Sequence, residues 1–300
     1  MRKHDPLIEG YLGYLAEVGR KSPRTIIDVR STLGRAVDGL GQRRPGVALW
    51  RLELEDYLHW IDRERAAGRT TSCLAKYLSH LRGLLDYAWR SGRAERNVLD
   101  GFQLQDATAR KEPRSLSLEE AQRLVASAPQ GTSAERRERL MLLLLYGCGL
   151  RTSELCSLNV SDVNRERREL QILKAKGDRP RCVPIPDGVY TELLAYLLER
   201  GSRGARGALF LTAARRRRIG AKDVCEVVRD AARRAGLSGS TTARTLRHTF
   251  ATHLMDRGVD LAVIASLMGH RSPQETGVYL HVLPNRREAA VQELPIGGRS

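Results

Sequence analysis

The sequence predicts a mainly α-helical protein, with an all-α first domain and an α+β second domain that adds a small antiparallel β-sheet to its helices. Apolar residues recur at helical spacing through residues 1–92 and again after residue 114. Residues 169–173 and 181–185 have strand character and flank a short turn, which is the pattern of a β-hairpin. Residues 93–113 lose the periodicity and are largely polar, so they predict a linker between the domains.

Four helices are expected in the first domain, residues 1–92. The pair Ser22-Pro23 is typical of a helix start and predicts the beginning of the second helix. The glycine-containing stretch 40–46 is expected to end that helix, and Gly68 to end the third. Basic side chains on these helices are candidate DNA contacts, although such side chains more often simply face solvent: Arg24, Lys76 and Arg82.

The second domain is expected to span residues 114–300. Ser117 with Glu120 forms a capping-box pattern at a helix start, and the apolar run 140–146 predicts a buried helix that ends at Gly147. Further helices are expected over 151–158 and 190–198, on either side of the hairpin. A run of four arginines predicts an exposed loop and supplies further candidate DNA contacts: Arg215, Arg216, Arg217 and Arg218.

The charge favours a polyanionic partner. The 300 residues include 51 Lys and Arg against 35 Asp and Glu, a formal net charge of +16. For a chain without membrane features, nucleic acid is the commoner polyanion, although a coding bias toward arginine is an alternative source of part of the excess. There is no apolar run of about 18 residues and no signal-peptide pattern at the start, which predicts a cytoplasmic protein with no membrane partner. The five scattered cysteines are expected to be reduced thiols.

Side chains suited to phosphate chemistry gather in the second domain. Arg247, His270 and Tyr279 follow one another late in the chain, and Arg151 and Lys176 precede them. Guanidinium groups are planar, permanently charged and able to donate two hydrogen bonds to a phosphate. A phenol, whose ordinary pKa is about 10, can attack phosphorus where nearby cations favour its phenolate form. The pattern therefore indicates a site that binds a phosphate and attacks it.

The spacing of these motifs resembles the catalytic domain of the tyrosine recombinases, which include phage integrases and Xer-type recombinases. The matching segments are Gly149-Leu-Arg151-Thr-Ser-Glu-Leu155, Lys176-Gly at the hairpin turn, Leu246-Arg247-His248-Thr-Phe-Ala-Thr-His253, Leu267-Met-Gly-His270, and Tyr279 nine residues later. The resemblance covers residues 115–283 in order. The first domain resembles the family's core-binding domain through its helix count alone.

The resemblance implies a role for each residue. Tyr279 is the expected nucleophile, which forms a 3′-phosphotyrosyl link to DNA and releases a 5′-hydroxyl. Arg151 and Arg247 are expected to stabilise the phosphate, Lys176 to protonate the leaving oxygen, and His270 to donate a hydrogen bond or orient the nucleophile. Lys174 is the nearby alternative to Lys176, and Glu154 and His248 are expected in supporting roles.

The family also implies partners and cofactors. We expect a tetramer on double-stranded DNA recombination sites, with accessory proteins possible and the segment after Tyr279 as an arm to a neighbouring protomer. Transesterification keeps the energy of the broken phosphodiester, so no metal, ATP or other cofactor is expected. Because the helical pattern begins near residue 6, a simple Xer-like or transposon-type enzyme is favoured over a large phage integrase.

One position departs from the family pattern. Members usually read Pro-His-x-Leu-Arg-His, whereas this chain has Ala243-Arg244-Thr-Leu-Arg247-His248. Arginine cannot act as a general base near neutral pH, although it can bind phosphate or favour a phenolate. Arg244 therefore leaves two hypotheses: an active recombinase, or a catalytically weakened DNA-binding relative with an accessory or regulatory role.

Two other classes fit the sequence less well. A helix-turn-helix regulator explains the charge and the rhythm of residues 256–270, but it has no need of Arg151, Lys176 and Tyr279 in order. A metal-dependent nuclease requires clustered carboxylates, which these motifs lack. His248 and His253 are five residues apart and have no evident third ligand, so packing or supporting roles are favoured over a metal site.

Overall fold

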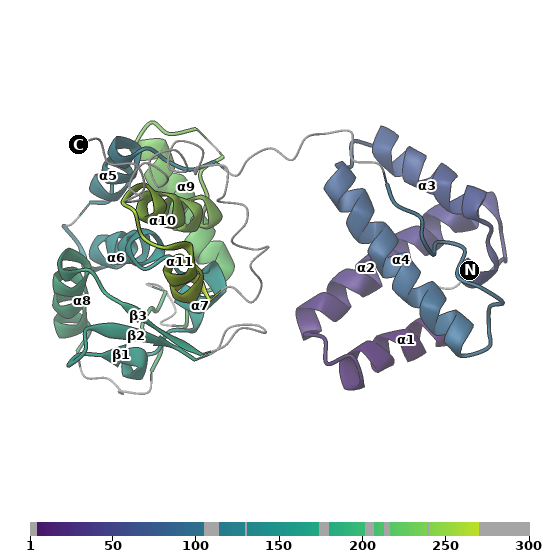
Figure 1. Cartoon of the computed structure of the whole chain (residues 1–300), viewed down its shortest axis with the longest axis horizontal. Helices are drawn as coiled ribbons and strands as arrows, with labels where there is room; N and C mark the ends of the chain where they lie inside the picture. The colour runs from purple at the N-terminus through teal and green to yellow at the C-terminus, as the bar shows by residue number, and fades with distance from the viewer. Residues whose placement is uncertain are drawn as a thin grey trace, which may run out of the picture. The chain divides into compact units, whose positions relative to one another are not determined.

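A computed structural model describes residues 5–104, 114–129, 131–173, 180–201, 207–212, 217–238 and 240–269. The chain divides into two compact units, residues 1–110 and 111–300 (Figure 1). The first unit is helical in its described part, and the second combines helices with one small sheet. The mainly α fold class with a small antiparallel sheet is thereby confirmed.

The described residues of the first unit form four α-helices and a short 3-10 helix. These are α1 (Pro6–Glu17), α2 (Pro23–Arg43), η1 (Leu49–Arg51), α3 (Leu54–Ala66) and α4 (Thr71–Arg90). Ser22 and Thr70 cap α2 and α4 by accepting hydrogen bonds from backbone amides in the first turn. The helix α2 ends at Arg43, inside the glycine-containing stretch 40–46 that was expected to end it, and Leu40 at the start of that stretch is buried in the core.

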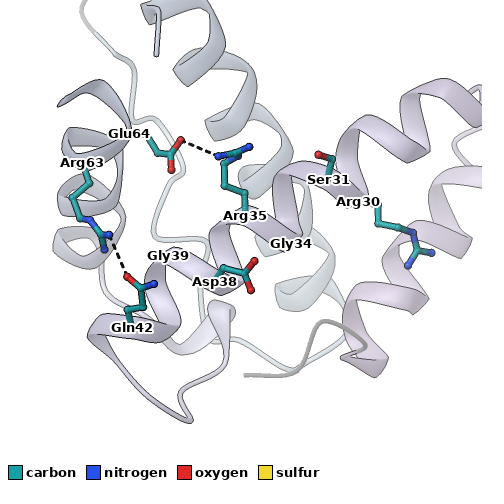
Figure 2. A pocket seen from close by; sticks show the side chains of 9 residues that line it. All are labelled: Arg30, Ser31, Gly34, Arg35, Asp38, Gly39, Gln42, Arg63 and Glu64. Atoms are coloured by element: carbon teal, nitrogen blue, oxygen red, sulfur yellow. Dashed lines mark hydrogen bonds and ion pairs between the residues drawn. The ribbon is translucent and has the colours of Figure 1, made fainter. Parts of the chain in front are cut away.

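Close packing between α2 and α3 depends on a glycine. Trp60 of α3 is buried, and a Cβ atom on Gly39 of α2 would lie 2.6 Å from its Cδ1. Beside this contact the two helices border a groove of about 610 Å³ (Figure 2). Arg35 and Glu64 form an ion pair across it at 3.8 Å, and Arg63 donates to Gln42 at 3.2 Å. These contacts favour a role for the groove's side chains in joining α2 to α3.

The core of the first unit extends beyond α4. Leu99 is fully buried in it, and the Arg82 guanidinium donates to the backbone carbonyls of Leu99 and Phe102. Asn97 donates to the Asp86 carboxylate at 2.6 Å. Part of the segment assigned to a linker by its composition therefore packs on the first unit, and residues 105–113 lie outside the described residues.

The second unit surrounds the apolar helix α6. Its elements are α5 (Leu118–Ala126), α6 (Ser133–Gly147), α7 (Thr152–Ser157), η2 (Val160–Asp162), β1 (Val163–Asn164), β2 (Glu169–Ile172), β3 (Arg181–Pro184), α8 (Asp187–Arg200), α9 (Ala221–Arg234), α10 (Ala243–Asp256) and α11 (Leu261–Met268). The strands form one antiparallel sheet in the order β1-β2-β3, with Leu170 opposite Val183. The helix α6 packs against α8 and α10, so it joins the sheet side of the unit to the helices that carry the site.

Candidate active site

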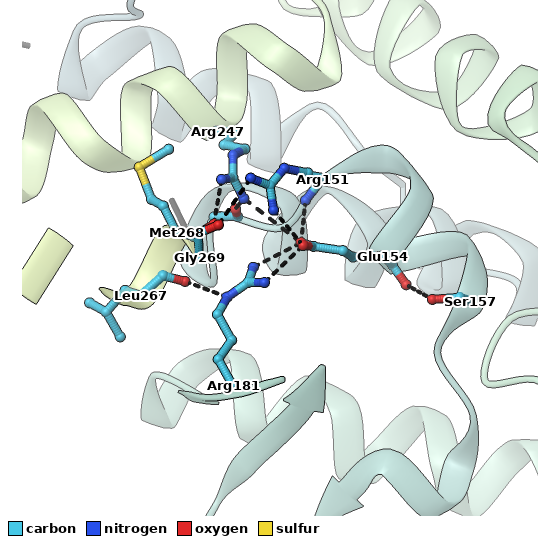
Figure 3. Close-up of polar contacts among 9 residues, drawn as sticks. Arg151, Glu154, Ser157, Arg181, Arg247, Leu267, Met268 and Gly269 are labelled. Carbon is cyan, nitrogen blue, oxygen red and sulfur yellow. Dashed lines mark hydrogen bonds and ion pairs between the residues drawn. The ribbon is translucent and has the colours of Figure 1, made fainter. Parts of the chain in front are cut away.

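Arginines from three separate elements meet at one buried carboxylate (Figure 3). Glu154 of α7 is fully buried, and its Oε1 accepts hydrogen bonds from Nη1 of Arg151 at 2.9 Å and from Nη1 of Arg181 at 2.8 Å. Its Oε2 accepts from Nη2 of Arg181 at 2.9 Å and lies 3.7 Å from Nη1 of Arg247. We call Glu154 with these three arginines the arginine cluster.

The turn before α7 sets the position of Glu154. Gly149 has a φ of +59°, and a Cβ atom there would lie 2.7 Å from Cε1 of Phe250, so glycine suits both the backbone angle and the space. Arg151 is the N-cap of α7, and its backbone amide donates to Glu154 Oε2 at 2.8 Å. Glu154 thus caps its own helix and holds the Arg151 side chain with the same carboxylate.

Arg247 ties α10 to two other segments. It is 8% exposed, donates from Nη1 to the Gly149 carbonyl at 2.7 Å, and donates from Nη2 to the Met268 carbonyl at 2.5 Å. The last turn of α11 and the turn before α7 are therefore joined through one guanidinium. Arg151 adds a second link, because its Nη2 donates to the Gly269 carbonyl at 3.3 Å.

Arg181 of β3 belongs to the arginine cluster although none of the sequence motifs includes it. Its side chain is 7% exposed, makes both hydrogen bonds to Glu154, and donates from Nε to the Leu267 carbonyl at 2.8 Å. The strand pattern carried a signal for it: alternation places residue 181 on the same face as the buried Val183 and Ile185. An arginine on the buried face of a strand requires a partner inside the protein, so this position is a signal that the sequence contains.

The electrostatics of the cluster favour an anion. Burial by itself raises the pKa of the Glu154 carboxyl, but the hydrogen bonds from Arg181 and from the Arg151 amide hold that pKa below its usual value. The carboxylate is therefore charged at neutral pH and sits among three guanidinium groups, which leaves a surplus of two positive charges. Such a surplus, largely removed from water, suits a phosphate group whose negative charge grows during reaction.

The structure brings together three of the residues predicted for catalysis or its support: Arg151, Glu154 and Arg247. Arg244 is exposed in the first turn of α10, three residues before Arg247 and so on the same side of the helix. His248 is buried at 5% exposure. Lys176, His270 and Tyr279 lie outside the described residues, although Arg181 and Gly269 are their near neighbours in sequence.

Several candidate DNA contacts are instead engaged within the protein. Arg218 donates from Nη1 to the carbonyls of Cys156, Ser157 and Leu158 at 3.1, 2.9 and 2.9 Å, so it caps the end of α7. Arg217 pairs with Asp223 at 3.3 Å. These hydrogen bonds favour a structural role for Arg218. Arg82 also has a structural role by this criterion, because it donates to carbonyls of the 99–102 segment.

The remaining DNA candidates have less to distinguish them. Arg24 is exposed in the first turn of α2, and the Lys76 ammonium lies 5.9 Å from the centre of the Tyr77 ring. Arg215 and Arg216 lie outside the described residues.

Within the described part of the chain, no group of three His, Cys, Asp or Glu side chains is placed to hold a metal ion. His253, one of the two histidines considered as ligands, lies between the Tyr146 hydroxyl at 2.8 Å and the Leu116 carbonyl at 3.0 Å. Among the helices that the structure describes, none is both long and apolar enough to cross a membrane.

Both units match the integrase class of proteins. Residues 114–286 match the Phage integrase family, and residues 8–92 match the Phage integrase, N-terminal SAM-like domain. The chain belongs to the phage integrase family.

Its curated relatives are tyrosine recombinases. The tyrosine recombinase of Pseudothermotoga lettingae is 30% identical over 96% of this chain and 98% of its own length. Tyrosine recombinase XerA of Pyrococcus furiosus is 37% identical, over 60% of this chain and 61% of the relative.

Solved structures share the fold. The Tn1549 transposon integrase in complex with circular intermediate DNA superposes with a TM-score of 0.76 at 22% identity, covering 95% of this chain and 98% of the other. XerH site-specific recombinase bound to palindromic difH substrate gives a TM-score of 0.74 at 20% identity, covering 90% and 79%. At these identities the likeness establishes the architecture of both units.

Proposed function

We propose that this protein is a site-specific DNA recombinase that cuts and rejoins strands through a 3′-phosphotyrosyl intermediate. The observation that carries the proposal is the arginine cluster, in which Arg151 and Arg247 converge from distant motifs on the buried Glu154. Membership of the phage integrase family supports the same activity. Two fixed guanidinium groups suit the charge that develops on the non-bridging oxygens of an attacked phosphodiester.

The proposed reaction is a balanced transesterification. The Tyr279 oxygen gives up its proton to solvent water and forms a bond to phosphorus, while the bond from phosphorus to the 5′-oxygen breaks. Lys176 supplies a proton to that departing oxygen, and His270 donates a hydrogen bond to a non-bridging oxygen. A 5′-hydroxyl from another strand then reverses the sequence and restores Tyr279. One phosphate ester replaces another at each step, so ATP is not needed.

We propose that Arg244 binds phosphate or favours the Tyr279 phenolate. Its exposed position in the first turn of α10 places it on the Arg247 side of that helix, where the positive end of the helix dipole also favours an anion. The alternative function, a weakened relative with an accessory role, rests on this same residue, because arginine cannot take a proton from the tyrosine.

The proposed partners follow from strand exchange. Double-stranded DNA is the substrate, and four protomers on two sites would allow strands to be exchanged in pairs. The segment after Tyr279 would contact a neighbouring protomer, accessory proteins are possible regulators of direction, and the compartment would be the cytoplasm. The net charge of +16 supports the choice of nucleic acid as the partner.

The test is covalent capture of DNA. Binding sites selected from random-sequence duplexes would be rebuilt with a nick beside the scissile phosphate, so that the short released strand diffuses away and religation stops. We expect a protein–DNA adduct in EDTA without ATP, and its loss in Tyr279→Phe. An adduct that persists in Tyr279→Phe, or one that requires a metal, contradicts the proposal.

The same substrate separates the two readings of Arg244. For an active recombinase in which Arg244 is adapted to its site, Arg244→His is expected to reduce or abolish the adduct. For a weakened relative, wild type is expected to form little adduct and Arg244→His to form more. DNA binding measured in parallel ensures that neither change simply reflects lost affinity.

A further inference from the structure

Arg181 joins three segments of the second unit through one side chain. From β3 it makes a two-pronged contact with Glu154 of α7, at 2.8 and 2.9 Å, and its Nε donates to Leu267 of α11 at 2.8 Å (Figure 3). Each nitrogen of the guanidinium therefore has a partner inside the protein. With its side chain only 7% exposed, Arg181 is placed to hold other groups and not to contact DNA.

We propose that Arg181 is a positioning residue for strand cleavage, which fixes the β2–β3 hairpin and the end of α11 against the arginine cluster. This inference rests on the proposed function, because Arg181 would affect the reaction through two proposed catalytic residues that are near it or near Gly269 in the sequence. Lys176 precedes Arg181 by five residues in the sequence, and His270 directly follows Gly269. A single guanidinium thereby fixes two described positions, Arg181 and the Gly269 end of α11, that stand close in sequence to the proposed acid and the proposed histidine.

The end of α11 is shaped around this side chain. Gly269 has a φ of +63°, and a Cβ atom on it would lie 2.8 Å from Nη1 of Arg181. The carbonyl of the same glycine accepts from Arg151 at 3.3 Å. Gly269 is thus held between two cluster arginines, and a larger residue would displace Arg181 or the turn.

Lysine cannot replace Arg181 in this arrangement. A guanidinium presents a rigid planar fork, so it reaches both Glu154 oxygens while Nε still points at Leu267. An ammonium is a point charge on a flexible stem and would keep the charge balance of the cluster without this geometry. Arg181→Lys therefore separates positioning from charge, and it leaves Glu154 with a cation nearby.

The first measurement compares cleavage with binding. On the nicked substrate under single-turnover conditions, Arg181→Lys is expected to slow adduct formation by about 10- to 100-fold, since a misplacement of about 1 Å has effects of this size. The dissociation constant for DNA should change by less than about twofold, because Arg181 is buried. Arg168→Lys is the matched control, since Arg168 lies beside β2 and makes an exposed ion pair with Asp187. It should leave both values unchanged.

The second measurement asks whether the hairpin has moved. A substrate with sulfur in place of the bridging 5′-oxygen releases a thiolate, which departs without a proton, so it bypasses the acid. We expect the sulfur-to-oxygen rate ratio to rise strongly in Lys176→Met, to rise in Arg181→Lys, and to equal the wild-type ratio in Arg168→Lys. Both rates come from one preparation, so the ratio does not depend on how much of a variant is folded.

The outcomes separate this inference from the proposed function. If wild type forms no Tyr279-dependent adduct, the recombinase proposal fails whatever Arg181→Lys does. If wild type forms the adduct and Arg181→Lys forms it at the same rate, the positioning role of Arg181 is overturned and the recombinase proposal stands. The same conclusion holds if Arg181→Lys forms the adduct more slowly with an unchanged sulfur-to-oxygen ratio, while Lys176→Met changes that ratio.

Discussion

Glu154 contacts all three arginines of the cluster, so it organises the site more than any single arginine does. It is fully buried, accepts hydrogen bonds from two guanidinium groups and one backbone amide, and lies 3.7 Å from a third guanidinium. A lone buried carboxylate would be costly, and so would the buried guanidinium groups of Arg181 and Arg247 without it. The glutamate and the arginines therefore stabilise one another, and the arginines are fixed before any phosphate arrives.

Replacing Glu154 by glutamine tests this dependence. At neutral pH we expect Glu154→Gln to lower the free energy of unfolding of the second unit by about 3–5 kcal/mol, because the arginines lose their counter-charge. Tryptophans 50, 60 and 89 all lie in the first unit, so the loss should appear in circular dichroism and leave the tryptophan fluorescence transition unchanged. Equal stability of the two proteins at pH 7 would contradict the assigned role.

The same pair of proteins gives a pH dependence with a defined sign. The folded-state pKa of Glu154 lies below the usual 4.5. Its stabilisation is therefore fully present above about pH 4.5 and is lost as the pH falls through the folded pKa. The stability difference between wild type and Glu154→Gln should shrink over that acidic range, as measured by urea unfolding at a series of pH values. A difference that stays constant on acidification would rule out the charged form as its origin.

Arg218 belongs to the four-arginine run that supplied candidate DNA contacts, but its guanidinium makes hydrogen bonds inside the protein. Since it donates to three carbonyls at the end of α7, Arg218→Ala should destabilise the second unit by about 1–3 kcal/mol. The slope of log affinity against log salt should stay the same. Replacing a true phosphate contact with alanine should reduce that slope by about 1, and the exposed candidate Arg24 provides the comparison. A reduced slope in Arg218→Ala would restore the DNA-contact hypothesis.

At the level of elements, periodicity predicted the helices and strands well. The capping patterns at Ser22 and Ser117 mark helix starts in the structure, and the hairpin forms β2 and β3. The strand β1 was not predicted, because two residues carry no alternation. The second helix ends at Arg43, within the stretch 40–46 predicted to end it, and the burial of Leu40 keeps the first residues of that stretch helical despite the low helix propensity of their glycine neighbours.

Two glycines on α2 form a matched pair for testing helix packing. Gly39→Ala should destabilise the first unit by about 1–3 kcal/mol, since its methyl group would press into the buried Trp60 ring. Gly34→Ala, five residues earlier on the same helix and with open space at its Cβ, should stabilise it by about 0.5–1 kcal/mol (Figure 2). Tryptophan fluorescence during urea unfolding measures both. Equal effects of the two changes would argue against the tight α2–α3 contact.

On the scale of the whole molecule, the net positive charge favours one class of partner, nucleic acid. The net charge of +16 is spread over a chain whose two parts match an integrase catalytic domain and an integrase N-terminal domain. Many arginines nevertheless serve internal contacts, as Arg82 and Arg218 do. Net charge therefore indicates the class of partner without identifying the residues that touch it.

The whole-molecule prediction concerns salt. If the protein neutralises roughly 6–10 phosphates, its affinity for duplex DNA should fall about 10³- to 10⁵-fold between 50 and 200 mM salt, because bound counterions are released. Fluorescence anisotropy with a labelled duplex over this range provides the slope. A shallow slope would show that little of the +16 charge faces DNA.

The sequence by itself determined the fold class, the family and the order of the motifs, because helix periodicity, capping residues and motif spacing are all local along the chain. Only the tertiary structure decided which arginines share a carboxylate and which hold the framework. Arg181 reaches Glu154 across 27 positions, and Arg247 reaches Gly149 across 98. Such pairings arise from how helices and strands pack, and a buried charge is tolerated only where packing supplies its partner. The partners of Arg181, and with them its place in the cluster, therefore became visible only in three dimensions.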